Sequence, residues 1–143
     1  MTDPTASQAG PSVYERVGCQ PFFDALVDRF YDAVEADPVL EPMYPSDDMA
    51  GARARLAGFL AQYWGGPTHY SDERGHPRLR MRHNPFTIGP IEREHWLAHM
   101  LGSVRMADLA VDVSEQMVAY FEAAATAMVN SPIRVAGPEA GNA

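Results

Sequence analysis

Apolar residues recur at helical spacing along much of the chain. After Pro21, which suits the first turn of a helix, apolar positions lie three or four residues apart, and acidic residues fill the opposite face. The pattern predicts a helix that ends at Asp37-Pro38, because proline disfavours helical backbone in the residue before it. Its predicted inward face consists of Phe22, Phe23, Leu26, Val27, Phe30, Tyr31 and Val34.

Similar apolar stripes predict three more long helices, which need caps and breakers at their ends. The predicted boundaries are Ser46 and Gly65-Gly66-Pro67 for the second helix, Gly89-Pro90 for the start of the third, and Asp112 or Ser114 and Asn130-Ser131-Pro132 for the fourth. The sequence lacks the alternation of apolar and polar residues that a sheet requires. We therefore expect an all-α domain.

Shorter segments connect these helices. Ser12 and Glu15 have the spacing of a capping box, which predicts a short helix that Gly18 can end. Residues 67–76 are polar and are predicted to form a loop, whereas residues 77–83 are predicted to form a helix of two turns. Residues 1–11 and 133–143 are rich in small and polar residues and are predicted to be disordered arms on one domain, residues 12–132.

Composition and charge exclude several classes of protein. The chain has 143 residues and a formal net charge of -8, which argues against a nucleic-acid binder. No apolar run approaches the ~20 residues of a membrane span, and the N-terminus lacks the order of a signal peptide. The single cysteine, Cys19, excludes an internal disulfide and fits a reducing cytoplasm.

The charge is unevenly distributed along the chain. Residues 69–83 contain four arginines and two acidic residues, a balance of +2, whereas the remainder carries -10. The same segment contains three of the five histidines. A basic segment with histidines in an acidic protein predicts a site for an anionic group.

Most catalytic templates are absent from the sequence. It has no glycine-rich phosphate loop, no nucleophile elbow and no paired-cysteine metal motif. His95 and His99 have the i, i+4 spacing of a two-histidine metal site, but no third ligand is evident, and such pairs also arise by chance.

His83 ends the predicted helix 77–83. A histidine there could simply be an exposed cation at a helix C-terminus. However, Leu79 lies one turn earlier, and the neighbouring arginines, Arg82 among them, suit anionic groups on a bound molecule. An imidazole above an apolar patch and beside arginines fits haem, whose iron takes the nitrogen and whose propionates pair with arginine.

Haem bound at His83 would need polar donors on its other face. Residues 46–64 contain no histidine, so Tyr31, Tyr44 and Trp96 are the candidate donors. Each of these aromatics taken alone could instead be ordinary core packing.

Several motifs resemble those of the group II truncated haemoglobins. They are Met43-Tyr44-Pro45-Ser46-Asp47-Asp48, the run from Phe59 to Gly65-Gly66-Pro67, Gly75-His76-Pro77 through His83, Arg29-Phe30-Tyr31, Glu94-His95-Trp96 and Met128 to Pro132. The resemblance covers about residues 13–132 and implies a two-over-two helical sandwich around haem b. Cys19 departs from it, since the family usually has a second glycine there.

The resemblance also implies roles for individual residues. His83 is the expected iron ligand, and Tyr31, Tyr44 and Trp96 are the expected distal hydrogen-bond donors. Ala52 is expected where many globins carry a distal histidine, with Leu56 one turn on over the haem face. The other expected cofactor contacts are Arg55 and Arg82 at the propionates, Phe59, Leu79, Tyr70 and His76.

These expectations predict a protein that binds oxygen reversibly and releases it slowly, since two or three hydrogen bonds to a charged ligand are each worth ~1.5–3 kcal/mol. Nitric oxide, carbon monoxide, peroxide and sulfide are possible further ligands. The alternative function is an enzyme, a nitric oxide dioxygenase or peroxidase, served by a reductase. A ligand sensor and a non-haem metal protein that uses His95 and His99 are further alternatives, and the family suggests that a homodimer is possible.

Overall fold

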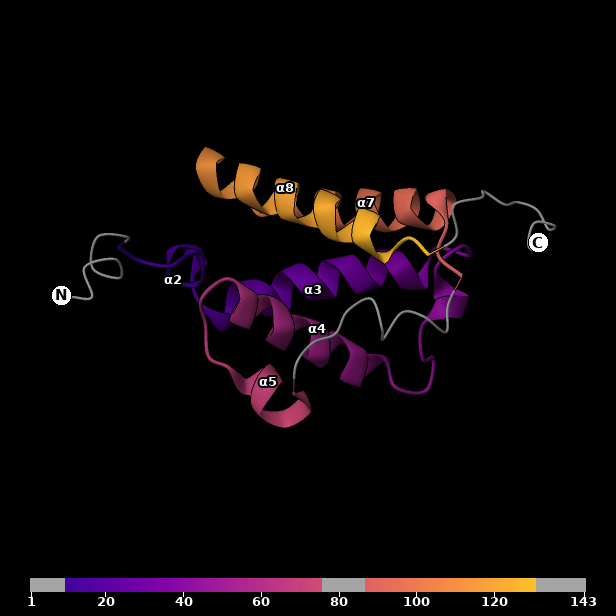
Figure 1. Cartoon of the computed structure of the whole chain (residues 1–143), viewed down its shortest axis with the longest axis horizontal. Coiled ribbons are helices and arrows are strands. Elements are labelled where there is room, and N and C mark those ends of the chain that lie inside the picture. Colours follow the sequence, from indigo (N-terminus) through magenta and orange to yellow (C-terminus); the bar gives the residue numbers. More distant parts are fainter. Residues whose placement is uncertain (1–9, 76–86, 131–143) are drawn as a thin grey trace.

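The computed structural model describes residues 10–75 and 87–130, and its regular segments are all helices (Figure 1). No β-strand occurs in those two ranges, which confirms the predicted all-α class. The helices are α2 (Val13–Val17), α3 (Gln20–Glu35), the 3-10 helix η1 (Glu41–Met43), α4 (Met49–Tyr63), α5 (His69–Arg74), α7 (Pro90–Arg105) and α8 (Val111–Met128).

Two pairs of helices build the molecule. Helix α3 packs against α4, α7 packs against α8, and contacts between α3 and α7 join the pairs (Figure 1). This is the predicted two-over-two sandwich, and α5 packs below α4. The largest fully buried side chains between the helices are Phe23, Phe30, Phe121, Leu26, Leu60, Met100 and Met117.

The first corner follows the predicted capping box. Glu15 N–H donates to Ser12 Oγ at 3.1 Å, and Ser12 N–H donates to Glu15 Oε1 at 3.0 Å. Gly18 closes α2 at a φ of 108°, a left-handed conformation that glycine adopts without steric cost. Cys19 follows at a φ of 68° as the N-cap of α3, with its side chain exposed.

Three predictions about local structure are wrong. Residues 69–74 form helix α5 rather than part of a polar loop, because tertiary contacts compensate for a short segment without an apolar stripe. The Gln62 side chain holds α5: it accepts from Ser71 N–H at 2.9 Å and donates to Ser71 Oγ at 2.7 Å. Asp48, not Ser46, caps α4, since its carboxylate accepts from Gly51 N–H. Helix α8 begins at Val111, one residue before Asp112, the earlier of the two predicted starts.

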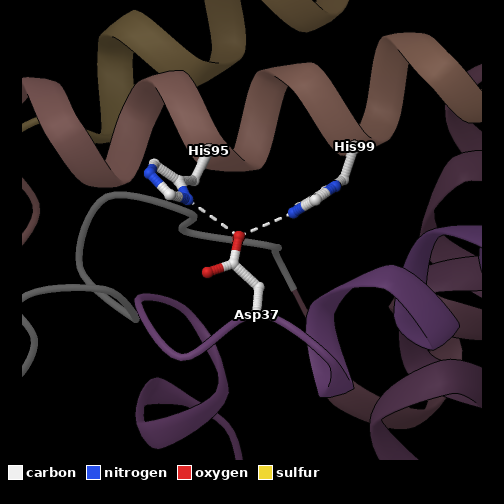
Figure 2. Close-up of side chains that lie close together, drawn as sticks. All are labelled: Asp37, His95 and His99. Carbon is white, nitrogen blue, oxygen red and sulfur yellow. Dashed lines mark hydrogen bonds and ion pairs between the residues drawn. The ribbon is translucent and has the colours of Figure 1, made fainter.

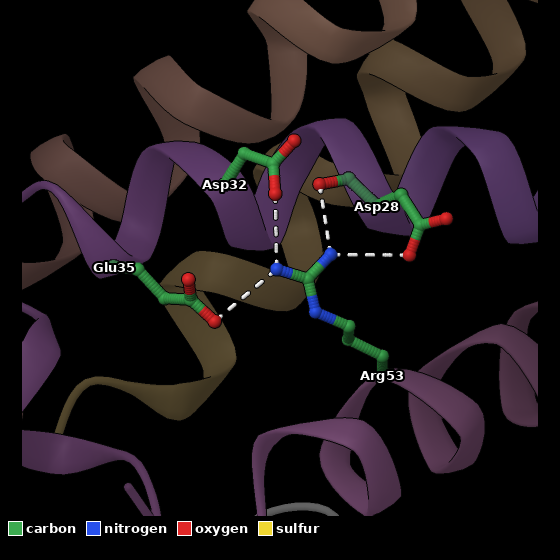
Figure 3. A network of polar contacts seen from close by, with 4 residues as sticks. All are labelled: Asp28, Asp32, Glu35 and Arg53. Carbon is green, nitrogen blue, oxygen red and sulfur yellow. Dashed lines mark hydrogen bonds and ion pairs between the residues drawn. The ribbon is translucent and has the colours of Figure 1, made fainter.

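An arginine-centred ion-pair network fastens α4 to α3 (Figure 3). Arg53 on α4 lies 3.1 Å from Asp28, 3.0 Å from Asp32 and 3.2 Å from Glu35, three acidic residues on the outer face of α3. Burial opposes its charge, but these carboxylates outweigh burial and raise the pKa of Arg53. The guanidinium also lies 5.6 Å from the centre of the Tyr31 ring. Arg53 therefore couples helix packing to a predicted site residue.

Several predictions lie outside the described residues. They concern residues 1–9 and 133–143 of the predicted arms, the predicted helix 77–83 and most of the basic segment. In the two described ranges, no helix is long and apolar enough to cross a membrane.

Candidate functional site

A cavity of about 360 Å³ opens between the helices. Its size is within the range typical of small-molecule and cofactor sites. Side chains of α3, α4, α5, α7, α8 and the corner around η1 line it, and most of them are apolar or aromatic. A cavity with this lining suits a large apolar group that carries a few polar substituents.

Tyr31, Tyr44 and Trp96 meet on one wall of this cavity. The Tyr31 and Tyr44 rings pack edge to face with their centres 5.4 Å apart. Phe30 lies behind them in the core, 5.1 Å from the Tyr31 ring and 5.4 Å from the Trp96 ring. These ring contacts hold the aromatics in fixed positions, so their polar atoms are placed by the core of the protein.

Both tyrosine hydroxyls remain protonated at neutral pH. Burial raises the pKa of Tyr31 to about 12, although the charges of Arg55 and Arg53 oppose this effect. Burial also raises the pKa of Tyr44, helped by Tyr31 and opposed by hydrogen bonding from Trp96. A neutral phenol carries an O–H, so the wall offers two hydroxyl donors and one indole N–H.

Helix α4 supplies an apolar wall. Ala52 is buried, whereas Leu56 and Phe59 are only partly buried because their side chains face the cavity. Tyr70 of α5 packs edge to face on Phe59 with ring centres 5.5 Å apart. A flat apolar group in the cavity would cover these half-buried side chains and remove apolar surface from water.

Arginines lie at the polar margin of the cavity. Arg55, Arg74 and Arg93 are all among its lining residues. The Arg55 guanidinium donates to Asp48 at 3.1 Å, and its side chain is about one-third exposed at 36%. Guanidinium groups at the margin of an apolar cavity are suited to carboxylates on a bound molecule.

The structure brings together all the predicted site residues that it describes. Tyr31, Tyr44, Ala52, Arg55, Leu56, Phe59, Tyr70 and Trp96 line the same cavity. His83, Arg82, Leu79 and His76 lie outside the described residues. Sequence reasoning missed Arg74 and Arg93 as lining residues; Arg74 belongs to the basic segment, which was the available signal, but nothing in the sequence distinguishes Arg93.

The histidine pair on α7 has a third neighbour (Figure 2). Asp37, which follows α3, accepts from His95 Nδ1 at 2.8 Å and from His99 Nε2 at 2.7 Å through the same oxygen, Oδ2. Asp37 is thus a candidate third ligand, and the sequence did not reveal it because Asp37 is 58 residues from His95. Burial raises the pKa of Asp37, but the hydrogen bonds from both imidazoles and from Val39 N–H outweigh it and lower that pKa well below its usual range.

Comparison with known proteins assigns the family. The sequence model of the bacterial-like globins matches residues 12–130. The group 2 truncated haemoglobin YjbI of Bacillus subtilis is 39% identical over 117 residues, which are 82% of this chain and 87% of that protein. The chain belongs to the group II truncated haemoglobins.

Solved structures agree with this assignment. A thermostable haemoglobin from Thermobifida fusca superposes with a TM-score of 0.83 and 51% identity, covering 86% of this chain and all of that one. The group II truncated haemoglobin of Bacillus anthracis superposes with a TM-score of 0.82 and 35% identity, covering 87% and 95%. These solved structures confirm the predicted fold.

Membership of the globins implies a haem cofactor and a diatomic gas as ligand. The cavity of this truncated haemoglobin fits that cofactor in three respects. It has an apolar wall left half-buried on α4, arginines at its margin and three donors on the wall formed by α3, α7 and the η1 corner. Each of these features corresponds to a part of haem or to a ligand bound on it.

Proposed function

We propose that this truncated haemoglobin binds oxygen reversibly at haem b and releases it slowly, held by hydrogen bonds from Tyr31, Tyr44 and Trp96. The observation that carries the proposal is the convergence of these three donors on one wall of an otherwise apolar cavity. Haem, when bound, supplies an iron that coordinates a diatomic ligand and shifts negative charge onto it. A relative from Bacillus subtilis, 37% identical to this chain, is described as an oxygen-avid truncated haemoglobin, which supports slow oxygen release here.

The protein holds its hydrogen-bond donors protonated and in place before the ligand binds. Tyr31 is 5% exposed, and its pKa of about 12 keeps the hydroxyl protonated throughout the physiological range. A hydrogen bond to a charged group is worth ~1.5–3 kcal/mol, so each donor slows ligand escape by about 10- to 100-fold. Phe30 packs against both Tyr31 and Trp96, so the core already fixes the positions of these two rings.

Other residues are proposed to hold the cofactor. Leu56 and Phe59 on α4 would pack on its face, and Arg55 would exchange part of its pairing with Asp48 for a propionate. His83 is proposed as the iron ligand, together with Arg82, Leu79, His76 and Tyr70 as further contacts. A His83→Ala protein that kept the wild-type ferrous spectrum would contradict the iron-ligand assignment.

Oxygen release after rapid mixing tests the donor proposal. Tyr31→Phe and Trp96→Phe each remove one donor while keeping an aromatic ring, and we expect each to speed release by about 10-fold or more. The matched controls are Tyr63→Phe and Trp64→Phe, which do not line the cavity and should leave the rate within about two-fold. Unchanged rates in both donor variants would disprove the role of the wall.

A second function, oxidation of nitric oxide or reduction of peroxide, has one supporting observation. Ala52 lines the cavity with a side chain of a single methyl group, which leaves space for a second reactant. Slow release suits such chemistry better than bulk oxygen delivery. This function needs a reductase in the cytoplasm, and sustained nitric oxide consumption with an electron donor separates it from simple binding.

A further inference from the structure

Asp37, His95 and His99 form a compact polar cluster between α7 and the segment that follows α3 (Figure 2). The two imidazoles lie one helical turn apart and point at a single carboxylate oxygen of the η1 corner. None of the three residues lines the 360 Å³ cavity. The cluster is therefore separate from the site proposed for haem.

The donor set matches a metal that prefers nitrogen and oxygen ligands. Each residue presents one ligand atom, and all three atoms lie within 4.8 Å of one another. Two histidines and one carboxylate, with a fourth position left to water, are a common ligand set for zinc. We propose that Asp37, His95 and His99 form a binding site for a divalent transition metal, with Zn²⁺ as the cation that fits the ligand set best.

The site needs little rearrangement to accept the ion. Zinc binds nitrogen and oxygen at ~2.0–2.2 Å, which separates tetrahedral ligands by about 3.3 Å. The present separations of Asp37 Oδ2 from the two ring nitrogens are 2.8 and 2.7 Å, so this oxygen and each nitrogen must move apart by about half an ångström. The two ring nitrogens, which lie within 4.8 Å of each other, must reach the same tetrahedral separation. Side-chain rotation on one helix face supplies such a shift without moving the backbone.

Access and charge also favour a cation. The His95 side chain is 40% exposed and that of His99 is 27% exposed, which leaves a path for the ion and for a water ligand. Asp37 is 7% exposed, and its pKa lies well below the usual range, so it is a carboxylate at neutral pH. Each ring nitrogen that binds the metal must be free of its proton; a neutral imidazole then carries its proton on the other ring nitrogen, and a charged one releases a proton to solvent.

Bound zinc would link two parts of the fold. Asp37 belongs to the corner that carries Tyr44, and His95 precedes Trp96 on α7. The hydrogen bonds already connect these segments across 58 and 62 residues of sequence. A coordinated ion would replace them with stronger bonds and stabilise the native state by mass action.

Calorimetric titration of the haem-loaded protein with Zn²⁺ in a buffer free of chelators tests the site. We expect one zinc ion per chain and a melting temperature that rises with zinc concentration. His95→Gln and His99→Gln should each weaken zinc binding by at least about 100-fold, since even loss of an outer-shell partner costs up to that much. Both positions are partly exposed on a helix surface, and glutamine retains a donor toward Asp37.

Two control variants test the alternative metal ligands. His69→Gln removes an exposed histidine on α5, and Cys19→Ser removes the exposed thiol. Both must keep wild-type zinc affinity, and X-ray absorption at the zinc edge must show two histidines and no sulfur in the coordination shell. Binding that survives His99→Gln, depends on His69 or Cys19, or shows a zinc–sulfur distance near 2.3 Å would overturn the proposal.

Discussion

At the scale of single residues, Tyr31 and Trp96 serve both the core and the cavity. Each packs against Phe30, and each also carries a hydrogen-bond donor at the cavity wall. Helical spacing alone predicts that Tyr31 faces inward, but it does not separate a core aromatic from a ligand contact. The motif resemblance predicts the ligand contact, because it links Tyr31 to residues that are distant in sequence.

The raised pKa of Tyr31 predicts that the protein loses stability at alkaline pH. An unfolded tyrosine loses its proton near pH 10, whereas folded Tyr31 holds it to about pH 12. Between these values the native state binds one more proton, so the free energy of unfolding falls as the pH rises. We expect the wild type to lose about 1 kcal/mol more than Tyr31→Phe between pH 9 and pH 11.

Urea unfolding across this pH range measures the difference. Tyr63→Phe is the matched control, since Tyr63 is 51% exposed, and it should keep the wild-type dependence on pH. Parallel pH profiles for wild type and Tyr31→Phe would show that the Tyr31 hydroxyl is not shielded from water.

At the level of elements, the long helices and the capped short helix α2 were predictable, whereas α5 was not. The inward stripe of α3 matches its buried residues apart from the partly exposed Phe22, because a long amphipathic helix repeats its signal several times. Helix α5 has six residues and depends on the side chain of Gln62, a contact that no local pattern reveals. The sequence likewise did not reveal that Asp37 lies beside His95, because the two residues are 58 positions apart.

The Arg53 network predicts how α4 is held on α3. Arg53→Met keeps the length of the side chain but leaves Asp28, Asp32 and Glu35 to repel one another. The carboxylates are 44–75% exposed, so solvent screens each pair, and we expect a total loss of about 1 kcal/mol in the free energy of unfolding.

Salt dependence identifies the cause of that loss. The deficit of Arg53→Met should shrink at high salt, where exposed charges are screened. Arg16→Met breaks one exposed ion pair with Asp112 and should cost less. A deficit equal to that of Arg16→Met, and unaffected by salt, would mean that the network adds nothing to helix packing.

At the scale of the whole molecule, two helix pairs enclose the cavity and determine which residues line it. The all-α class and the two-over-two arrangement were predictable, the first from periodicity and the second from the family resemblance. Eight of the residues that line the cavity were also predicted, but its full extent was not, because the wall continues to Met128 at the end of α8. Its margin includes Arg93, which no motif marked.

We propose that the donor wall formed by Tyr31, Tyr44 and Trp96 acts by charge rather than by shape. Oxygen and carbon monoxide are similar in size, but coordinated oxygen takes on far more negative charge, so donors should hold it selectively. The most direct measurement is the dissociation rate of both gases from the Tyr31→Phe/Trp96→Phe double variant relative to wild type. We predict oxygen release about 100-fold faster or more, with carbon monoxide release changed by only a few-fold. Equal acceleration of both gases, or none for oxygen, would show that the donors do not act on the charge of the bound ligand.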